Sequence, residues 1–223
     1  MNNATRLYRK PLALIIAVVF TAQVLALATP QSGGIPSEFG AQLSSQVNTL
    51  DSFIKDLTSF EASVEALKKK ASKTPAEIAA LQRQGEGLKR RISSVQQSVQ
   101  AILDKLRAAG KDTGDFDNVL AGEFSKTPSS SSVLNSIKQD GGARASLRRF
   151  LSILSQFPGA IDGAVQGVTG TATVRSTELS GRKCLGLKIL AIGALLIGAK
   201  ATRDAAEREH DRGKCNDRTL STS

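Results

Sequence analysis

Two amphipathic stretches of nearly equal length, both within residues 37–110, constrain the fold of this chain more than any other feature. In each stretch apolar residues recur every seven positions, with a second apolar series three or four positions away. An α-helix places residues with this spacing on one face, so each stretch predicts a long helix that buries one side against a partner. These apolar positions are Leu43, Val47, Leu50, Phe53, Ile54, Leu57, Phe60, Val64 and Leu67 in the first stretch, and Ile78, Leu81, Leu88, Ile92, Val95, Val99, Ile102 and Leu106 in the second.

The segment between the two stretches predicts that they fold back on each other as an antiparallel, coiled-coil-like hairpin. Thr74 can accept a hydrogen bond at the start of the second helix, and Glu77 can accept one from the Thr74 amide, which is the capping-box arrangement. Pro75 suits the first helical turn, where its missing N–H would have had no partner within the helix.

The first residues of the chain have the three parts of a secretory signal peptide. Three basic residues precede an apolar run over residues 12–27, and the small residues Ala26 and Ala28 suit the cleavage site. We therefore expect residues 1–28 to be removed by cleavage after Ala28, the mature protein to be secreted, and residues 29–36 to form a flexible lead-in. An uncleaved anchor is the alternative, because the apolar run approaches the roughly 20 residues of a spanning helix.

Charge and composition narrow the range of partners. The formal net charge is +10, and it becomes +7 once the three basic residues of the signal peptide are removed. Surfaces that bind single-stranded nucleic acids also need stacking aromatic side chains. This chain lacks Trp, and its single Tyr lies in the signal peptide, so we do not expect a nucleic-acid partner. An anionic membrane surface or an acidic cell-envelope polymer requires only the positive field and remains a candidate.

After the hairpin, residues 111–132 form a polar linker with a short helix predicted over residues 117–124 and a Ser-rich end. Asp112, Asp115 and Asp117 resemble the start of a calcium loop. The EF-hand pattern, however, requires a ligand where Val119 stands and a glycine where Leu120 stands. We therefore interpret these aspartates as part of an ordinary turn.

We expect residues 133–215 to form a smaller helical region and residues 216–223 to form a disordered tail. Helices are expected over residues 133–139 and 143–157, followed by a stop at Pro158-Gly159 and a polar connection over residues 171–182.

Glycines suggest two places where helices approach each other closely. Small residues over 160–170 include Gly159, Gly163, Gly167 and Gly170, which would form a ridge that lets another helix come near. In the hairpin, Gly85 should lie opposite Phe60 and make room for its ring.

Residues 185–199 form an almost wholly apolar segment that contains one charged residue, Lys188. As a helix it would be about 22 Å long, too short for a hydrocarbon core of about 30 Å. We interpret it as a buried core helix, and as an alternative it is a segment that inserts into a membrane. The membrane-active candidates are Leu185, Leu187, Ile189, Leu190, Ile192, Leu195, Leu196 and Ile197.

Two cysteines, Cys184 and Cys215, flank this segment, and in an exported protein with an even cysteine count they predict a disulfide. A straight helix between them would hold the sulfur atoms far apart. The helix should therefore break at Gly193 or Gly198, which gives a closed hairpin with one apolar and one charged limb.

Catalytic chemistry has little support in the sequence. The single histidine, His210, follows Glu207 in a lone Glu-x-x-His, whereas a di-iron site requires two such motifs. We interpret His210 as a solvated residue on a charged helix, and we expect no enzyme activity, cofactor or metal. The dibasic pairs Arg148-Arg149 and Arg182-Lys183 are candidate processing sites of a secreted precursor.

These observations together predict an all-α secreted protein that consists of a long helical hairpin and a smaller C-terminal helical region closed by one disulfide. The expected function is non-enzymatic binding or effector activity on a protein or cell-envelope partner of a host or competitor. The alternative is a membrane-active toxin, pore-forming or killer-type, that inserts residues 185–199. The sequence indicates no particular oligomeric state.

Overall fold

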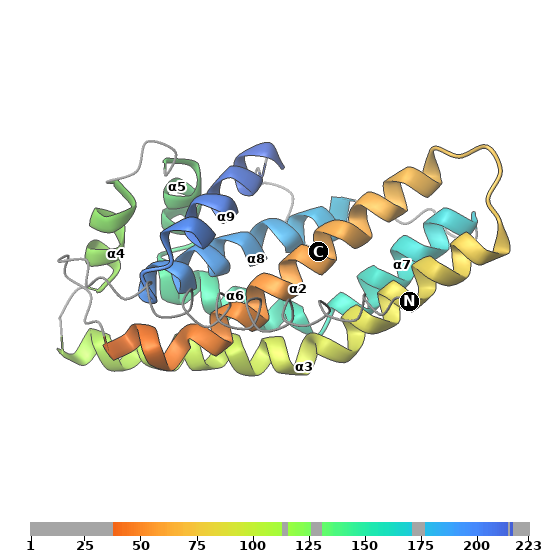
Figure 1. The fold of residues 1–223 in the computed structure, drawn as a ribbon. Helices are drawn as coiled ribbons and strands as arrows, with labels where there is room; N and C mark the ends of the chain where they lie inside the picture. Colours follow the sequence, from red (N-terminus) through yellow and green to blue (C-terminus); the bar gives the residue numbers. More distant parts are fainter. Residues whose placement is uncertain (1–37, 113–115, 126–130, 171–176, 214, 216–223) are drawn as a thin grey trace, which may run out of the picture. The chain divides into compact units, whose positions relative to one another are not determined.

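In the computed structural model of the chain, the two heptad stretches form long helices that pack antiparallel (Figure 1). Helix α2 spans Glu38–Lys68 and α3 spans Pro75–Asp112. Apolar side chains from both helices, including Leu50, Phe60 and Val99, are completely shielded from solvent. The predicted helical hairpin is therefore confirmed.

The described part of the chain comprises residues 38–112, 116–125, 131–170, 177–213 and 215. All of these residues belong to one unit, residues 34–223. The signal peptide, its cleavage after Ala28, the lead-in over residues 29–36, most of the Ser-rich segment and the tail over residues 216–223 lie outside the described residues and stay predictions.

The connection between α2 and α3 contains the predicted capping box. The Thr74 amide donates to Glu77 Oε2 at 3.0 Å, and the Glu77 amide donates to Thr74 Oγ1 at 3.3 Å. Pro75 is the first residue of α3. Two backbone donors at the start of this helix are thus satisfied by side chains, which fixes where α3 begins.

Six further helices follow, and every secondary-structure element among the described residues is helical, which confirms the all-α class. Because Pro158 lies in the first turn of the fourth of them, it begins a helix rather than ending one. The polar connection expected over residues 171–182 is also shorter than predicted, because a helix begins at Thr177. The six helices are α4 (Phe116–Ser125), α5 (Ser131–Gln139), α6 (Ala143–Leu154), α7 (Phe157–Thr169), α8 (Thr177–Leu196) and α9 (Lys200–Arg212).

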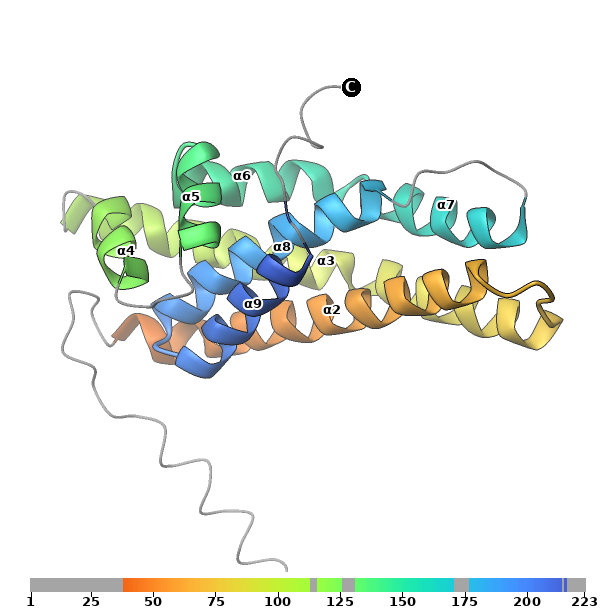
Figure 2. The same ribbon diagram turned by 90° about the horizontal axis from the view of Figure 1, so that it is seen from above.

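The later helices pack on the hairpin around α8. Helices α6 and α7 lie along α3, while α8 contacts α2 on one side and α6, α7 and α9 on others. Figure 2 shows α8 between α6 and α9. The buried apolar residues form one continuous cluster from Phe39 to Ala206, so the hairpin and the C-terminal region share a single core.

Two glycines of α8 allow it to approach α2 closely. A Cβ atom at Gly193 would lie 3.0 Å from Val47 Cγ2, and one at Gly186, two turns earlier, would overlap Ile54 Cδ1. The predicted glycine ridge over residues 160–170 is helical, but at Gly159 a Cβ would meet nothing within 4 Å. The close approach of α8 to α2 thus involves Gly186, and Gly193, which the sequence suggested as a helix break and which instead lies inside α8.

The chain reverses between α8 and α9 at Gly198, one of the two predicted break points. Gly198 has φ = +68°, a conformation that glycine adopts without strain, and the Ala199 amide donates to Ala194 O at 2.8 Å. This reversal brings Cys184 and Cys215 together with their Cα atoms 5.6 Å apart in a disulfide. The predicted disulfide-closed hairpin, with apolar α8 and charged α9, is confirmed.

Candidate functional site

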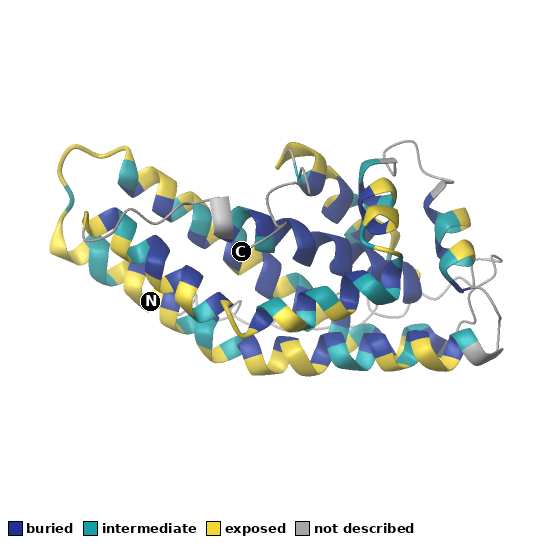
Figure 3. Cartoon of the chain, turned by 180° about the vertical axis from the view of Figure 1, so that it is seen from behind, coloured by how far each residue is buried: buried dark blue, intermediate teal, exposed yellow. Residues whose placement is uncertain are grey.

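The candidate membrane-active segment lies in the interior of the unit. Every residue from Lys183 to Leu196 is buried, because helices from four directions pack on α8. Figure 3 shows the buried colour along most of this helix. Among the described helices, none is both long enough and apolar enough to span a membrane. Seven of the eight candidates are buried, namely Leu185, Leu187, Ile189, Leu190, Ile192, Leu195 and Leu196, and Ile197 is half-buried.

Lys188, the charged residue inside this segment, forms a buried ion pair. Its Nζ lies 3.1 Å from Asp140 Oδ2, and each of the two side chains is only 1% exposed. Asp140 also accepts hydrogen bonds from Ser146 Oγ at 3.0 Å and from Arg149 Nη1 at 2.6 Å. The Asp140 carboxylate therefore links α8 to the turn between α5 and α6 and to α6 itself.

Helix α9 covers α8 with a largely polar inner face. Arg203, Glu207 and His210 are all buried, and Ala206 is the buried apolar residue among them. Ser132 Oγ of α5 lies 3.0 Å from His210 Nδ1, and Arg203 Nε lies 3.9 Å from Glu207 Oε1. The Arg203–Glu207 pair lies within α9, whereas the Ser132 contact and the disulfide connect α9 to α5 and α8.

The prediction that His210 is solvated is wrong. Its side chain is 1% exposed, because the reversal at Gly198 turns this face of α9 inward against α5 and α8. The hydrophilic sequence around His210 gave no sign of this burial, because the residues that cover His210 belong to helices distant in the sequence. Within the described residues, no group of three or more His, Cys, Asp or Glu side chains could hold a metal ion.

The candidate processing residues lie on two packed helices. Arg148 of α6 is exposed, whereas Arg149 bonds to Asp140. On α8, Arg182 stacks on an aromatic ring, its guanidinium carbon 5.8 Å from the Phe157 ring centroid. Cleavage at either pair would require the local helix to open, and processing stays a prediction.

Lys183 joins three helices next to the disulfide. Its Nζ lies 2.6 Å from Glu61 Oε2 of α2 and 3.8 Å from Glu209 Oε1 of α9. Burial raises the pKa of Glu61 above its ordinary value, although the bond to Lys183 opposes this shift. The ion pair therefore fastens both limbs of the C-terminal hairpin to α2.

Asp117, one of the three aspartates considered for calcium, instead caps a helix. Its Oδ1 accepts a hydrogen bond from the Ala143 amide at 3.1 Å, at the N-terminus of α6. A negative charge at this end of a helix is favourable. Gly142, with φ = +99°, leaves no Cβ to displace this carboxylate.

At the turn of the hairpin, four lysines gather without an intervening acidic residue. We call Lys68, Lys69, Lys70 and Lys73 the lysine tip; Lys69 and Lys70 are exposed and the other two are half-exposed. Lys70 forms an ion pair with Glu77, and Lys68 lies 3.5 Å from Glu65 Oε1. The hydrogen bond from Lys70, followed by those from Thr74, lowers the pKa of Glu77 to about 2.

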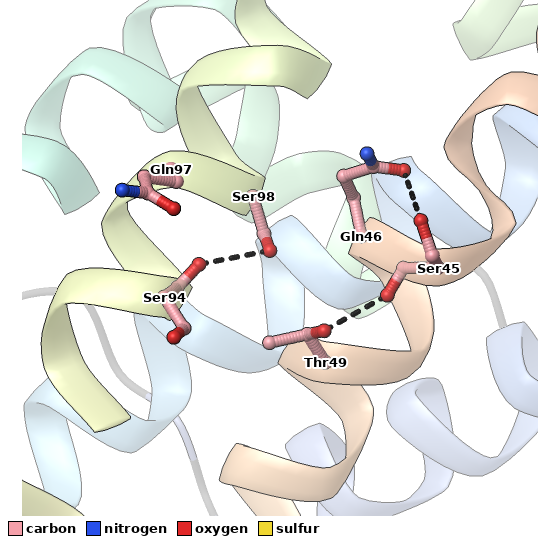
Figure 4. A pocket seen from close by; sticks show the side chains of 6 residues that line it. All are labelled: Ser45, Gln46, Thr49, Ser94, Gln97 and Ser98. Carbon is pink, nitrogen blue, oxygen red and sulfur yellow. Dashed lines mark hydrogen bonds between the residues drawn. The ribbon is translucent and has the colours of Figure 1, made fainter. Parts of the chain in front are cut away.

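A shallow polar hollow of roughly 220 Å³ lies between α2 and α3 (Figure 4). Three of its four hydroxyl groups donate within their own helix: Ser98 Oγ to Ser94 O at 2.9 Å, Thr49 Oγ1 to Ser45 O at 2.9 Å, and Ser45 Oγ to Gln46 Oε1 at 2.9 Å. The hollow is therefore a weak candidate for binding or catalysis, because most of its hydroxyl donors already have acceptors. It is lined by Ser45, Gln46, Thr49, Ser94, Gln97 and Ser98.

Comparison with protein-family models, with curated proteins and with solved structures finds no match to this chain. The candidate functional features therefore rest on the sequence and structure of this chain alone. They are the enclosed helix α8 and the lysine tip.

Proposed function

We propose that this chain is a secreted, non-enzymatic helical binding or effector protein that acts through its folded surface on a host, competitor or cell-envelope partner. The observation that carries this proposal is the enclosure of α8. The apolar stretch of α8, residues 185–196, lies in the core, so the groups available to a partner are mainly polar and charged side chains on the outer faces of the helices.

The competing function, membrane insertion of residues 185–199, has a larger structural cost. Insertion would separate Lys188 from the buried Asp140 carboxylate and place a lysine in hydrocarbon, at a cost of about 2.5–3.5 kcal/mol near the bilayer centre. The segment would also have to leave α2, against which Gly186 and Gly193 fit. The disulfide to Cys215 ties the start of α8 to the end of α9 and opposes this rearrangement.

A dye-release experiment distinguishes the two functions. The mature, disulfide-intact protein is added to anionic liposomes loaded with a fluorescent dye, and circular dichroism checks that the protein is folded. We expect no release, because α8 stays in the core. Release by the wild-type protein that is lost in Ile192→Asp, provided that this variant keeps its helical spectrum, would reject the proposal and support the toxin.

Secretion is tested separately by N-terminal sequencing of the protein recovered from the medium of expressing cells. We expect the mature chain to begin at Thr29, whereas a chain retained in the cell with residues 1–28 attached would contradict export.

A further inference from the structure

The lysine tip is the densest run of basic residues without an intervening acidic residue in the sequence. Residues 66–76 contain four lysines and no acidic residue, and no other eleven-residue stretch has four basic residues without an acidic one. The turn lies at the end of the hairpin remote from α4 and α5 (Figures 1 and 2). The nearest carboxylates in the sequence, Glu65 and Glu77, already pair with Lys68 and Lys70. Neither Lys69 nor Lys73 has an ion-pair partner among the described residues.

Stabilisation of the hairpin does not account for Lys69 and Lys73. A cation favours the carbonyl end of a helix only within its last turn, and of the four lysines only Lys68 lies in the last turn of α2. Lys73 directly precedes Thr74, the cap of α3, so it lies near the positive end of that helix, where a cation is unfavourable. The side chains also repel one another. Lys68 and Lys70 thus have stabilising partners, whereas Lys69 and Lys73 have none among the described residues.

We propose that the lysine tip binds the surface of an anionic phospholipid bilayer. This inference rests on the proposed function, because it names the surface on which the folded protein acts. The lysines surround a reverse turn at one end of the hairpin instead of lining a groove, and this arrangement suits a flat sheet of charge better than a linear polymer. Lysine ammonium groups interact with phosphate and carboxylate groups as point charges and require no fixed orientation of the headgroup.

The same residues indicate how the contact is made. The exposed apolar residues of the turn are small, Ala71, Pro75 and Ala76, so the turn has no large side chain to insert into the hydrocarbon. Binding is therefore electrostatic, peripheral and reversible by salt, since exposed charges are screened beyond about 10 Å at 0.1 M ionic strength and beyond about 3 Å at 1 M. Helix α8 remains in the core throughout.

The test compares two variants with the same net charge. In Lys69→Gln/Lys73→Gln two charges leave the tip, and in the control Lys138→Gln/Lys200→Gln two exposed lysines are removed from the end of α5 and the start of α9. Co-sedimentation is measured with phosphatidylcholine vesicles that contain about 30% phosphatidylserine, and with phosphatidylcholine alone. Each lysine near an anionic leaflet strengthens binding about 5-fold, so the tip variant should bind roughly 25-fold more weakly and the control like the wild type.

Thermal melting provides a second measurement. The tip variant should melt at the same or a higher temperature than the wild type, because a repulsive cation has left the start of α3, so weaker binding cannot result from misfolding. Equal weakening in both double variants would overturn the assignment, as would wild-type binding that persists in about 1 M NaCl. Retention on an acidic polysaccharide without binding to phosphatidylserine vesicles would also overturn it. Dye release by the wild type would instead reject the proposed function, whatever the two variants do.

Discussion

The buried ion pair between Lys188 and Asp140 predicts that replacing Asp140 destabilises the fold more than replacing Lys188. Asp140→Asn keeps the shape of the side chain and an acceptor oxygen but removes the charge that Lys188 binds inside the core. Lys188→Met replaces the buried lysine with an apolar chain of similar length. In that variant Asp140 still accepts hydrogen bonds from Ser146 and from Arg149, whose side chain is 34% exposed. The two substitutions should therefore differ in cost.

Removing one member of a buried pair costs about 3–5 kcal/mol, because the remaining charge is left without compensation. For Asp140→Asn we expect the lower end, about 3 kcal/mol, since the amide oxygen still faces the ammonium group. At roughly 2–4 °C per kcal/mol for a domain of this size, the melting temperature should fall by about 6–12 °C. Lys188→Met should cost about 1 kcal/mol or less, because the carboxylate keeps its other partners and the new side chain is apolar.

The assay is urea unfolding of the disulfide-intact protein, followed by circular dichroism, for both single variants and for the double variant Asp140→Asn/Lys188→Met. The double variant should be more stable than Asp140→Asn alone, with a coupling energy of about 2 kcal/mol. If Lys188→Met is as destabilising as Asp140→Asn, or if the two effects add without coupling, the reasoning about the buried lysine is refuted.

Three further predictions concern the hairpin and the disulfide. Gly85→Leu should lower the free energy of unfolding by about 1–3 kcal/mol, because a Cβ atom at this position would lie 3.0 Å from a methyl group of Ile161 in α7. In the matched control Gly87→Leu, the new Cβ would have no atom within 4 Å, so the free energy of unfolding should stay unchanged or rise by up to about 1 kcal/mol. Calorimetry that shows equal effects would contradict the packing. The Glu77 carboxyl should titrate by NMR near pH 2, because the hydrogen bonds from Lys70 and then from Thr74 lower its pKa. Its stabilising contribution is complete above the ordinary pKa of 4.5 and is lost as the pH falls through about 2, so a midpoint near 4.5 would argue against the Lys70 pair and the capping bonds. Replacing Cys184 and Cys215 by serine should cost about 3–4 kcal/mol by the chain-entropy estimate for a separation of 31 residues, and denaturant unfolding that shows no loss would count against the disulfide.

The hairpin could be predicted from sequence because its signals are local. A heptad series such as Leu43, Leu50 and Leu57 defines a helical face by itself, and the capping box at Thr74 and Glu77 marks the start of the next helix within four residues. The disulfide was predicted for a similar reason, since only two cysteines exist and the helix between them had to break.

The misses concern residues whose environment is made by distant segments. His210 lies on a hydrophilic helix, and only the tertiary reversal at Gly198 buries it. Asp140, the partner of Lys188, is separated from it by 48 residues, and its position before two glycines indicates a turn but no ion pair. Gly186 and Gly193 are spaced by seven residues in an apolar run, which is a sequence signal of close helix packing; for Gly193 a helix break was predicted instead.

Because α8 lies at the centre of the core but late in the sequence, the core stays incomplete during most of synthesis. The helix that fills the middle of the core, residues 177–196, is synthesised only after α2 to α7. Until then, residues of the hairpin that will contact it, such as Val47 and Ile54, have no covering surface. We therefore expect a chain that terminates before Thr177 to be degraded or to aggregate, since exposed apolar surface promotes association.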